Sequence, residues 1–163
     1  MPQLQVPNFG ELLAPFISAV PAQAMPNFLA LLERGAAQRY RHWAEKLPEF
    51  REGLTACADS EDEIANIVER VFPIDPALTD ELQAPLPAAR ETYYEAFAGL
   101  SLADQLGIQA DAELQGAEAW RAMLSDDNSE ELQAGLMKCI TLEQESSAYL
   151  YSIIDAVKAA EKS

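Results

Sequence analysis

The chain has 163 residues, of which 49% are hydrophobic, 27 are acidic and 11 are basic, so its formal net charge is −16. This length and apolar content are typical of one globular domain with its own core, and they exclude a largely disordered chain. The charge argues against nucleic acid and anionic membranes as partners, since both attract basic surfaces, and it suits a protein partner of basic character.

Residues 1–25 form an apolar segment that is interrupted by Pro7, Pro15 and Pro21. The sequence predicts a short helix from residue 9 to about residue 20, kinked or shortened by Pro15. The apolar face of this helix consists of Phe9, Leu12, Leu13, Phe16 and Ile17. Such a face is unusual on a surface, so we expect it to pack on the rest of the protein or to bind a partner. No basic residue precedes Arg34, which argues against a signal peptide.

Residues 26–163 are predicted to form a single helical-bundle domain. Its first helix begins at Pro26, a favourable first-turn residue, and runs to about Leu47. This helix groups three side chains that could hold a small anion: Arg39, Arg41 and His42. The alternative interpretation is that its basic residues face the acidic surfaces of neighbouring helices or of a second copy in a homodimer.

Further short helices are predicted between residues 49 and 124. The spacing of Ser60 and Glu63 is that of a capping box, so residues 59–63 are expected to be a turn between two helices. Prolines make residues 73–87 a surface connection. A helix from Pro87 to about residue 98 follows, then a short one that ends at Gly107, and then one from about residue 112 to residue 124.

The longest predicted helix runs from Asn128 to Lys162. It contains no proline, it has acidic residues in its first turn and lysines in its last, and an apolar stripe recurs at steps of three and four residues. A helix of about 30 residues is about 45 Å long and crosses a domain of this size. We therefore expect an all-α fold, a bundle of about five or six helices packed on this C-terminal helix.

The apolar stripe of the long helix is interrupted at Glu143, which is followed by Ser146 and Ser147. A buried carboxylate is costly unless it is paired, hydrogen-bonded or protonated. Three interpretations stay open: Glu143 reaches solvent or an arginine, it belongs to a buried polar layer that fixes helix register, or it marks a ligand or metal site in the core. A ligand site could include Tyr93 and the carboxylate pair Glu91 and Glu95 on the helix after Pro87.

Recognised catalytic and cofactor motifs are missing from the sequence. His42 is the single histidine, so the two Glu-x-x-His pairs of a di-iron carboxylate bundle are not present. Cys57 and Cys139 are too few for a disulfide framework, which is typical of a cytoplasmic protein. No uninterrupted apolar run reaches transmembrane length. We assign no catalytic residue, no cofactor and no metal, and an enzyme stays only a further alternative.

The function that these features favour is non-catalytic binding of a protein partner, as in a regulator, adaptor, chaperone or immunity protein. Two alternatives stand beside it. One is a binder of an apolar or aromatic small molecule in the bundle core, at the Glu143 layer. The other is an amphipathic coat protein that uses the N-terminal apolar face at an apolar surface.

Overall fold

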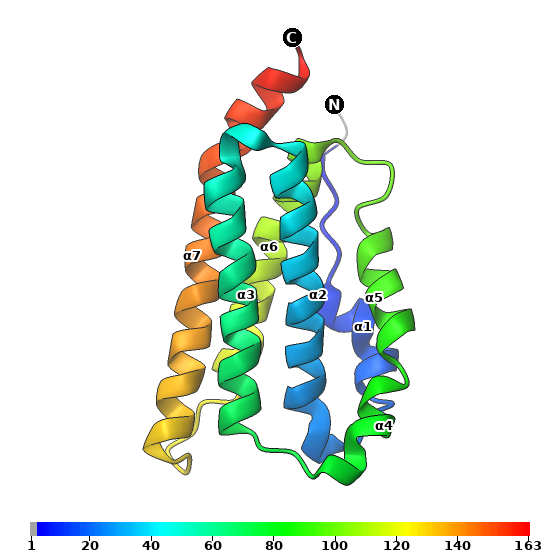
Figure 1. The fold of residues 1–163 in the computed structure, drawn as a ribbon, viewed down its shortest axis with the longest axis vertical. Coiled ribbons are helices and arrows are strands. Elements are labelled where there is room, and N and C mark those ends of the chain that lie inside the picture. Colours follow the sequence, from blue (N-terminus) through cyan, green and yellow to red (C-terminus); the bar gives the residue numbers. More distant parts are fainter. Residues whose placement is uncertain (1–2) are drawn as a thin grey trace.

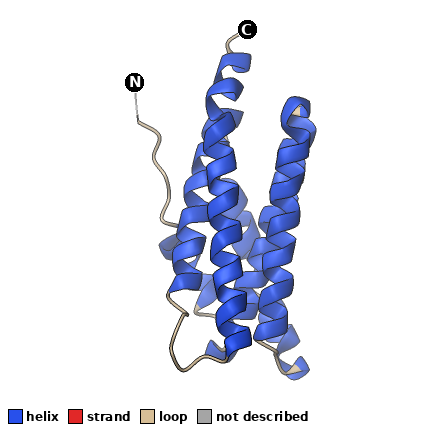
Figure 2. Ribbon diagram, turned by 90° about the vertical axis from the view of Figure 1, so that its left-hand side faces the viewer, coloured by secondary structure: helices blue, strands red, loops and turns tan. Residues whose placement is uncertain are grey.

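The computed structural model describes residues 3–163, and within that range the protein contains seven α-helices and no strand (Figures 1 and 2). The predicted all-α bundle on a long C-terminal helix is confirmed. This helix, α7, spans Glu130–Glu161, and the Ser129 side chain caps it by accepting a hydrogen bond from the backbone N–H of Leu132 at 3.1 Å. Lys158 lies in its last turn, where a positive charge stabilises the helix dipole.

Four long helices form the bundle, in two antiparallel pairs. Helix α2 (Met25–Lys46) packs along α3 (Arg51–Val71), α6 (Leu102–Arg121) packs along α7, and α3 also packs against α7. The chain returns from α3 to α6 through the short α4 (Thr79–Gln83) and then α5 (Leu86–Glu95). Because this crossover runs the length of the bundle, α3 and α6 point in the same direction (Figure 1).

Two of the predicted breaks are wrong, because α3 and α6 are each continuous. Residues 59–63 are helical within α3, and Gly107 lies inside α6. In α3 the buried residues Leu54, Cys57 and Ala58 continue into Ile64 on the same face, so burial along the whole helix outweighs the local capping signal. In α6 the glycine costs only about 1 kcal/mol against alanine, which packing against α7 offsets.

The core consists of two clusters of buried apolar residues that follow one another along the bundle. The first includes the fully buried Trp43 and Phe97, whose rings meet edge to face with centroids 5.4 Å apart. The second includes Trp120 and Leu136. On α3, α6 and α7 the residues of the two clusters are separated by a few positions, and those intervening positions hold the polar groups described below.

Helix α1 (Phe9–Ile17) covers one side of the bundle, against α2, α5 and α6. Phe9 and Leu13 are buried, and Phe9 packs on Tyr93 of α5 with ring centroids 5.8 Å apart. Gln115 of α6 fixes the start of α1: its side-chain oxygen accepts a hydrogen bond from the N–H of Phe9 at 2.8 Å, and its amide donates to the carbonyl of Pro7 at 2.9 Å.

Candidate functional site

Glu143 lies on the inward face of α7 with only 1% of its surface exposed. Ser146 and Ser147 are buried beside it, and the Ser147 hydroxyl donates to the carbonyl of Ala110 on α6 at 2.7 Å. Within residues 3–163, Glu143 forms no ion pair. The interpretation in which it reaches solvent or an arginine is therefore wrong, and the polar middle of α7 belongs to the core.

Each of the other three long helices brings a glutamate to the same level of the bundle. These are Glu33 of α2, Glu61 of α3 and Glu113 of α6, and with Glu143 they form what we call the glutamate cluster. Glu61 and Glu113 are buried, and Glu33 is partly buried. One carboxylate oxygen from each of Glu33, Glu61 and Glu143 lies within 4.8 Å of the others. Oxygen ligands of one cation, at about 2.0–2.6 Å from it, are likewise at most about 5 Å apart.

No basic side chain compensates the glutamate cluster within the described part of the chain. The ion pairs of the structure involve other acidic residues, and both oxygens of Glu61 and one oxygen of Glu143 have no hydrogen-bond donor. An uncompensated buried carboxylate costs several kcal/mol, so this arrangement requires positive charge in the form of protons or a cation.

Glu113 differs from its three neighbours because protein donors hold it in place. The Tyr40 hydroxyl donates to Glu113 Oε1 at 2.8 Å, and Gln109 Nε2 donates to the same oxygen at 2.7 Å. The Tyr93 hydroxyl in turn donates to Gln109 Oε1 at 2.5 Å. Burial and the nearby glutamates raise the pKa of Tyr40 and Tyr93 well above the usual range, so both stay protonated as donors.

Burial also shifts the pKa values of three glutamates upward. It raises the pKa of Glu33 from an ordinary 4.5 to about 7, with the charge of Glu113 adding to the effect and the contact with Glu61 opposing it. The pKa values of Glu61 and Glu143 are raised well above the usual range, first by burial and then by the charges of the other glutamates. These carboxyl groups therefore hold protons near neutral pH unless a cation takes their place.

Gly116 of α6 makes room for the Glu143 carboxylate. A Cβ atom at this position would overlap Glu143 Oε2, so any larger residue would displace the carboxylate from its place in the cluster. Glycine is disfavoured inside helices, and its use here provides the space that the acid occupies.

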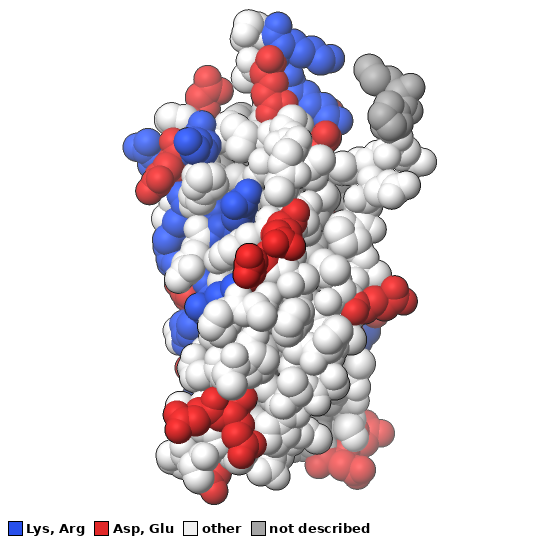
Figure 3. Space-filling view, turned by 90° about the vertical axis from the view of Figure 1, so that its right-hand side faces the viewer, with Lys and Arg blue, Asp and Glu red and all other residues white. Residues whose placement is uncertain are grey.

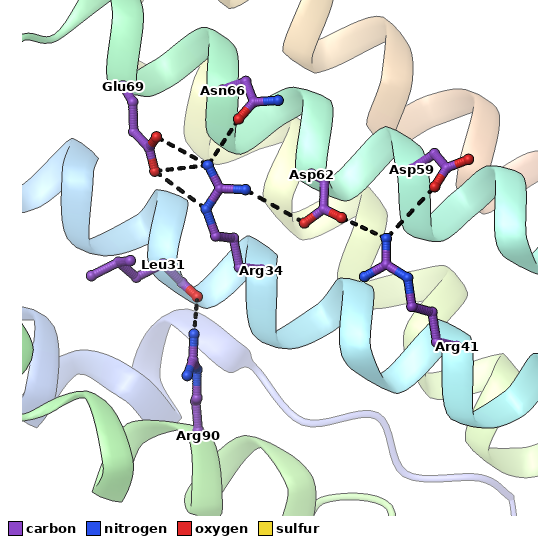
Figure 4. Close-up of polar contacts among 8 residues, drawn as sticks. All are labelled: Leu31, Arg34, Arg41, Asp59, Asp62, Asn66, Glu69 and Arg90. Carbon is purple, nitrogen blue, oxygen red and sulfur yellow. Dashed lines mark hydrogen bonds and ion pairs between the residues drawn. The ribbon is translucent and has the colours of Figure 1, made fainter.

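On the outer face of α2 and α3 the acidic residues are paired with arginines, unlike those of the glutamate cluster (Figure 4). Arg34 lies 3.0 Å from Glu69 and 3.5 Å from Asp62, and Arg41 lies 2.6 Å from Asp62. The interpretation that the basic residues of α2 face the acidic surface of a neighbouring helix is confirmed for Arg34 and Arg41.

The two arginines of the predicted anion site are engaged by other groups of the protein. The guanidinium of Arg39 lies over the rings of Trp43 and Phe97, at 5.4 Å and 5.0 Å from their centroids, and donates to Gln105. Arg41 is paired with acids of α3, and His42 is exposed.

The other predicted site residues are also divided. Tyr93 points into the bundle and reaches the glutamate cluster through Gln109, whereas Glu91 and Glu95 are exposed on α5. Of the expected partner-binding face, Phe9 and Leu13 are buried, Phe16 and Ile17 are partly buried, and Leu12 is exposed.

Sequence reasoning identified Glu143 and missed Glu33, Glu61 and Glu113. The sequence predicts a turn at Glu61, and it gives Glu33 and Glu113 no role. A signal was present, because each lies three or four positions from core residues on both sides, as Glu61 does between Ala58 and Ile64. Together, the glutamates on the buried stripes of four helices predict a cluster of acids in the core.

No family model, curated protein or solved structure matches this chain. Within the part of the chain that the structure describes, each helix is too short or too polar to span a bilayer.

Proposed function

We propose that this protein binds a divalent metal ion in the bundle core, through Glu33, Glu61 and Glu143 with Glu113 beside them. The observation that supports this proposal is the convergence of oxygens from Glu33, Glu61 and Glu143 within 4.8 Å of one another, with buried Glu113 beside them and no basic partner among the described residues. A divalent cation offsets much of this negative charge in a small volume and gives the orphaned oxygens of Glu61 and Glu143 a ligand role.

The donor set favours Mn²⁺ among the common divalent cations. All candidate ligands are carboxylate oxygens, which suit Mg²⁺, Ca²⁺ and Mn²⁺, whereas zinc and copper sites favour imidazole or thiolate. Mg²⁺ usually keeps several waters, and Ca²⁺ takes six to eight oxygens, which fit a buried site of a few carboxylates less well. This proposal replaces our expectation from the sequence that the protein has no metal.

Ferritin-like helical bundles offer a general analogy for such a site. In ferritin-like bundles, glutamates from four helices bind two iron or manganese ions, and two of them belong to Glu-x-x-His motifs. Here the residues three positions after Glu61 and Glu143 are Ile64 and Ser146. This chain therefore has no histidine at the positions that supply imidazole ligands in those bundles. This is a further reason to expect a metal that accepts oxygen ligands alone.

Titration of the metal-free protein with Mn²⁺ tests the proposal. Free Mn²⁺ gives a strong six-line signal in electron paramagnetic resonance, and binding in the core should remove that signal in a saturable way. Glu61→Gln should lower the affinity at least about tenfold, as expected when a carboxylate ligand becomes an amide. The matched control is Glu69→Gln on the outer face of the same helix, which should bind as the original protein does. Equal affinity in both variants would overturn the proposal.

Association with a protein partner stays a second proposal, supported by the largely uncharged face seen in Figure 3. Exposed apolar side chains near α1 include Leu4, Val6 and Leu12. A second copy of the chain is the simplest partner to test. Light scattering should then show a dimer that Leu12→Glu dissociates, and a monomer at every concentration would discard the homodimer.

A further inference from the structure

A cavity of about 500 Å³ adjoins the glutamate cluster, between α1, α2 and α6. Glu33, Glu113 and Glu143 line its inner end, so any molecule in the cavity lies directly beside the carboxylates. Most of the remaining wall is apolar and includes Leu13, Leu29, Leu32, Ala112, Ala119 and Met123. The volume is within the range of small-molecule sites in proteins.

The wall provides few polar atoms beyond the glutamates, and one of them, Trp120 Nε1, has no hydrogen-bond partner. It contains no lysine, arginine or histidine. Gln109 is already bonded to Tyr93 and Glu113, and Gln115 is bonded to the start of α1 and to Asp111. A molecule that fits this cavity is therefore apolar along most of its length, with one polar end at the glutamate cluster.

Part of the wall is open to solvent, which gives a ligand a way in. Ala119 in the last turn of α6 and Ala122 just after this helix are exposed, and Ile17, Met25 and Met123 are partly exposed. The inner end, in contrast, is occupied by buried Glu113 and Glu143. The cavity thus leads from the surface at the C-terminal end of α6 to the buried carboxylates. A linear molecule would enter it with its polar end first.

We propose that the cavity binds a medium-chain fatty acid, with its carboxylate as a ligand of the metal ion and its alkyl chain along the apolar wall. This inference rests on the proposed metal site. With the cation in place, the polar end of the ligand must be an oxygen donor, and a carboxylate completes an oxygen-only coordination sphere. Without the cation, the protonated carboxyl groups offer no metal ion for the carboxylate to bind, and any glutamate that has lost its proton repels a carboxylate and favours an ammonium group instead.

Binding of a matched series of probes to the Mn²⁺-loaded protein tests this inference. Hexanoate, octanoate and decanoate should bind with rising affinity, because each added methylene in an apolar cavity contributes about 0.8 kcal/mol, or about a fourfold change. Decanoate should also alter the resonance spectrum of the bound Mn²⁺, since it enters the coordination sphere. In the metal-free protein at the same pH, decanoate should bind at least about tenfold more weakly.

Two alanines provide a matched pair of variants. Ala119→Trp fills the outer part of the cavity and should reduce decanoate affinity at least about tenfold, while Mn²⁺ binding persists. Ala56→Trp places the same side chain on an exposed position of α3 that does not line the cavity, and should bind decanoate as the original protein does.

The outcomes separate the two proposals. Normal Mn²⁺ binding without decanoate binding would overturn the fatty-acid inference and leave the metal site standing. Binding of decylamine to the metal-free protein, with release on addition of Mn²⁺, would overturn it in favour of an ammonium ligand. Failure of Mn²⁺ itself to bind would overturn the proposed function and with it this inference.

Discussion

The pair α2 and α3 places neighbouring charged residues in opposite environments. Asp62 on the outer face lies against the guanidinium groups of Arg34 and Arg41, whereas Glu61, one residue before it, is buried against other carboxyl groups. Glu33 and Arg34 show the same division on α2. A helix turns by about 100° per residue, so adjacent positions can face solvent and core.

Acidic side chains therefore have different physical effects on the surface of this protein and in its core. On the surface, excess charge is solvated and partly paired, and it influences solubility more than the fold. In the core the same chemical group is desolvated and unpaired, and it acts on both stability and binding.

Raising the pH from about 5 to about 8 should destabilise the metal-free protein by about 3 kcal/mol or more. The folded-state pKa of Glu33 is about 7 against an ordinary 4.5, so between these values the unfolded chain releases a proton that the folded chain retains. The stabilising contribution of the Glu33 proton is fully present below pH 4.5 and is lost as the pH rises through 7. For this partly exposed group it amounts to up to about 3 kcal/mol. Glu61 and Glu143 shift in the same direction.

Urea unfolding with a chelator present measures this pH effect. Repulsion among surface charges also grows with pH, but added salt screens it, whereas the buried contribution is screened much less. The loss should therefore persist in high salt. Mn²⁺ at about 100 times its dissociation constant should restore about 3 kcal/mol at the higher pH. A stability that rises over this range would contradict the assignment of buried, unpaired acids.

Replacing core and surface acids by glutamine should change stability in opposite directions. At about pH 8 and without metal, Glu61→Gln should stabilise the protein by about 1–4 kcal/mol, because it removes an uncompensated buried acid. Glu69→Gln should destabilise it by less than about 1 kcal/mol, because it removes an exposed ion pair with Arg34. Near pH 4.5 the effect of Glu61→Gln should largely disappear. If both variants changed stability in the same direction at high pH, the distinction between the core acids and the surface acids would be wrong.

The long helix and the fold class could be predicted because their signals are local and repeated. From Glu130 to Glu161 the caps, the charges and the apolar stripe all agree, and the structure places the ends within two residues of the predicted ones. The continuity of α3 could not be read in the same way, because Ser60 and Glu63 have a real capping spacing that is overruled by packing against other helices.

The glutamate cluster could be predicted only in part, because it is a property of four helices together. Glu143 is visible from the sequence because it interrupts a clear apolar stripe. Glu33 and Glu113 lie on helices whose buried faces also contain small or polar residues, such as Ala37 and Gln109, so they do not stand out. Which carboxylates meet depends on the crossover that places the pair α6 and α7 against the pair α2 and α3, and no local pattern indicates that arrangement.

Adding one methyl group at Gly116 should disturb the cluster without removing any of its acids. In Gly116→Ala the new Cβ overlaps Glu143 Oε2, so the carboxylate must move, at a cost of about 1–3 kcal/mol. We expect weaker Mn²⁺ binding and a lower melting temperature for the metal-loaded protein. Gly107→Ala on the same helix is the control: its Cβ would lie 3.1 Å from the end of the Leu4 side chain, which can move. The control should keep full Mn²⁺ affinity and gain up to about 1 kcal/mol from helix propensity.

The smallest effect is expected from replacing Arg34, which follows Glu33 in the sequence but lies outside the glutamate cluster in space. Arg34 donates to Asn66 at 2.9 Å and to Glu69 at 3.0 Å, and about 30% of its side chain is exposed. Arg34→Ala should therefore cost about 1 kcal/mol or less, and the cost should shrink in high salt. Because its guanidinium faces away from Glu33, Mn²⁺ affinity should stay within about twofold, since only long-range charge is lost. A tenfold change in that affinity would mean that the outer ion pairs and the inner carboxylates act as one charge network, and the two faces of α2 could no longer be treated separately.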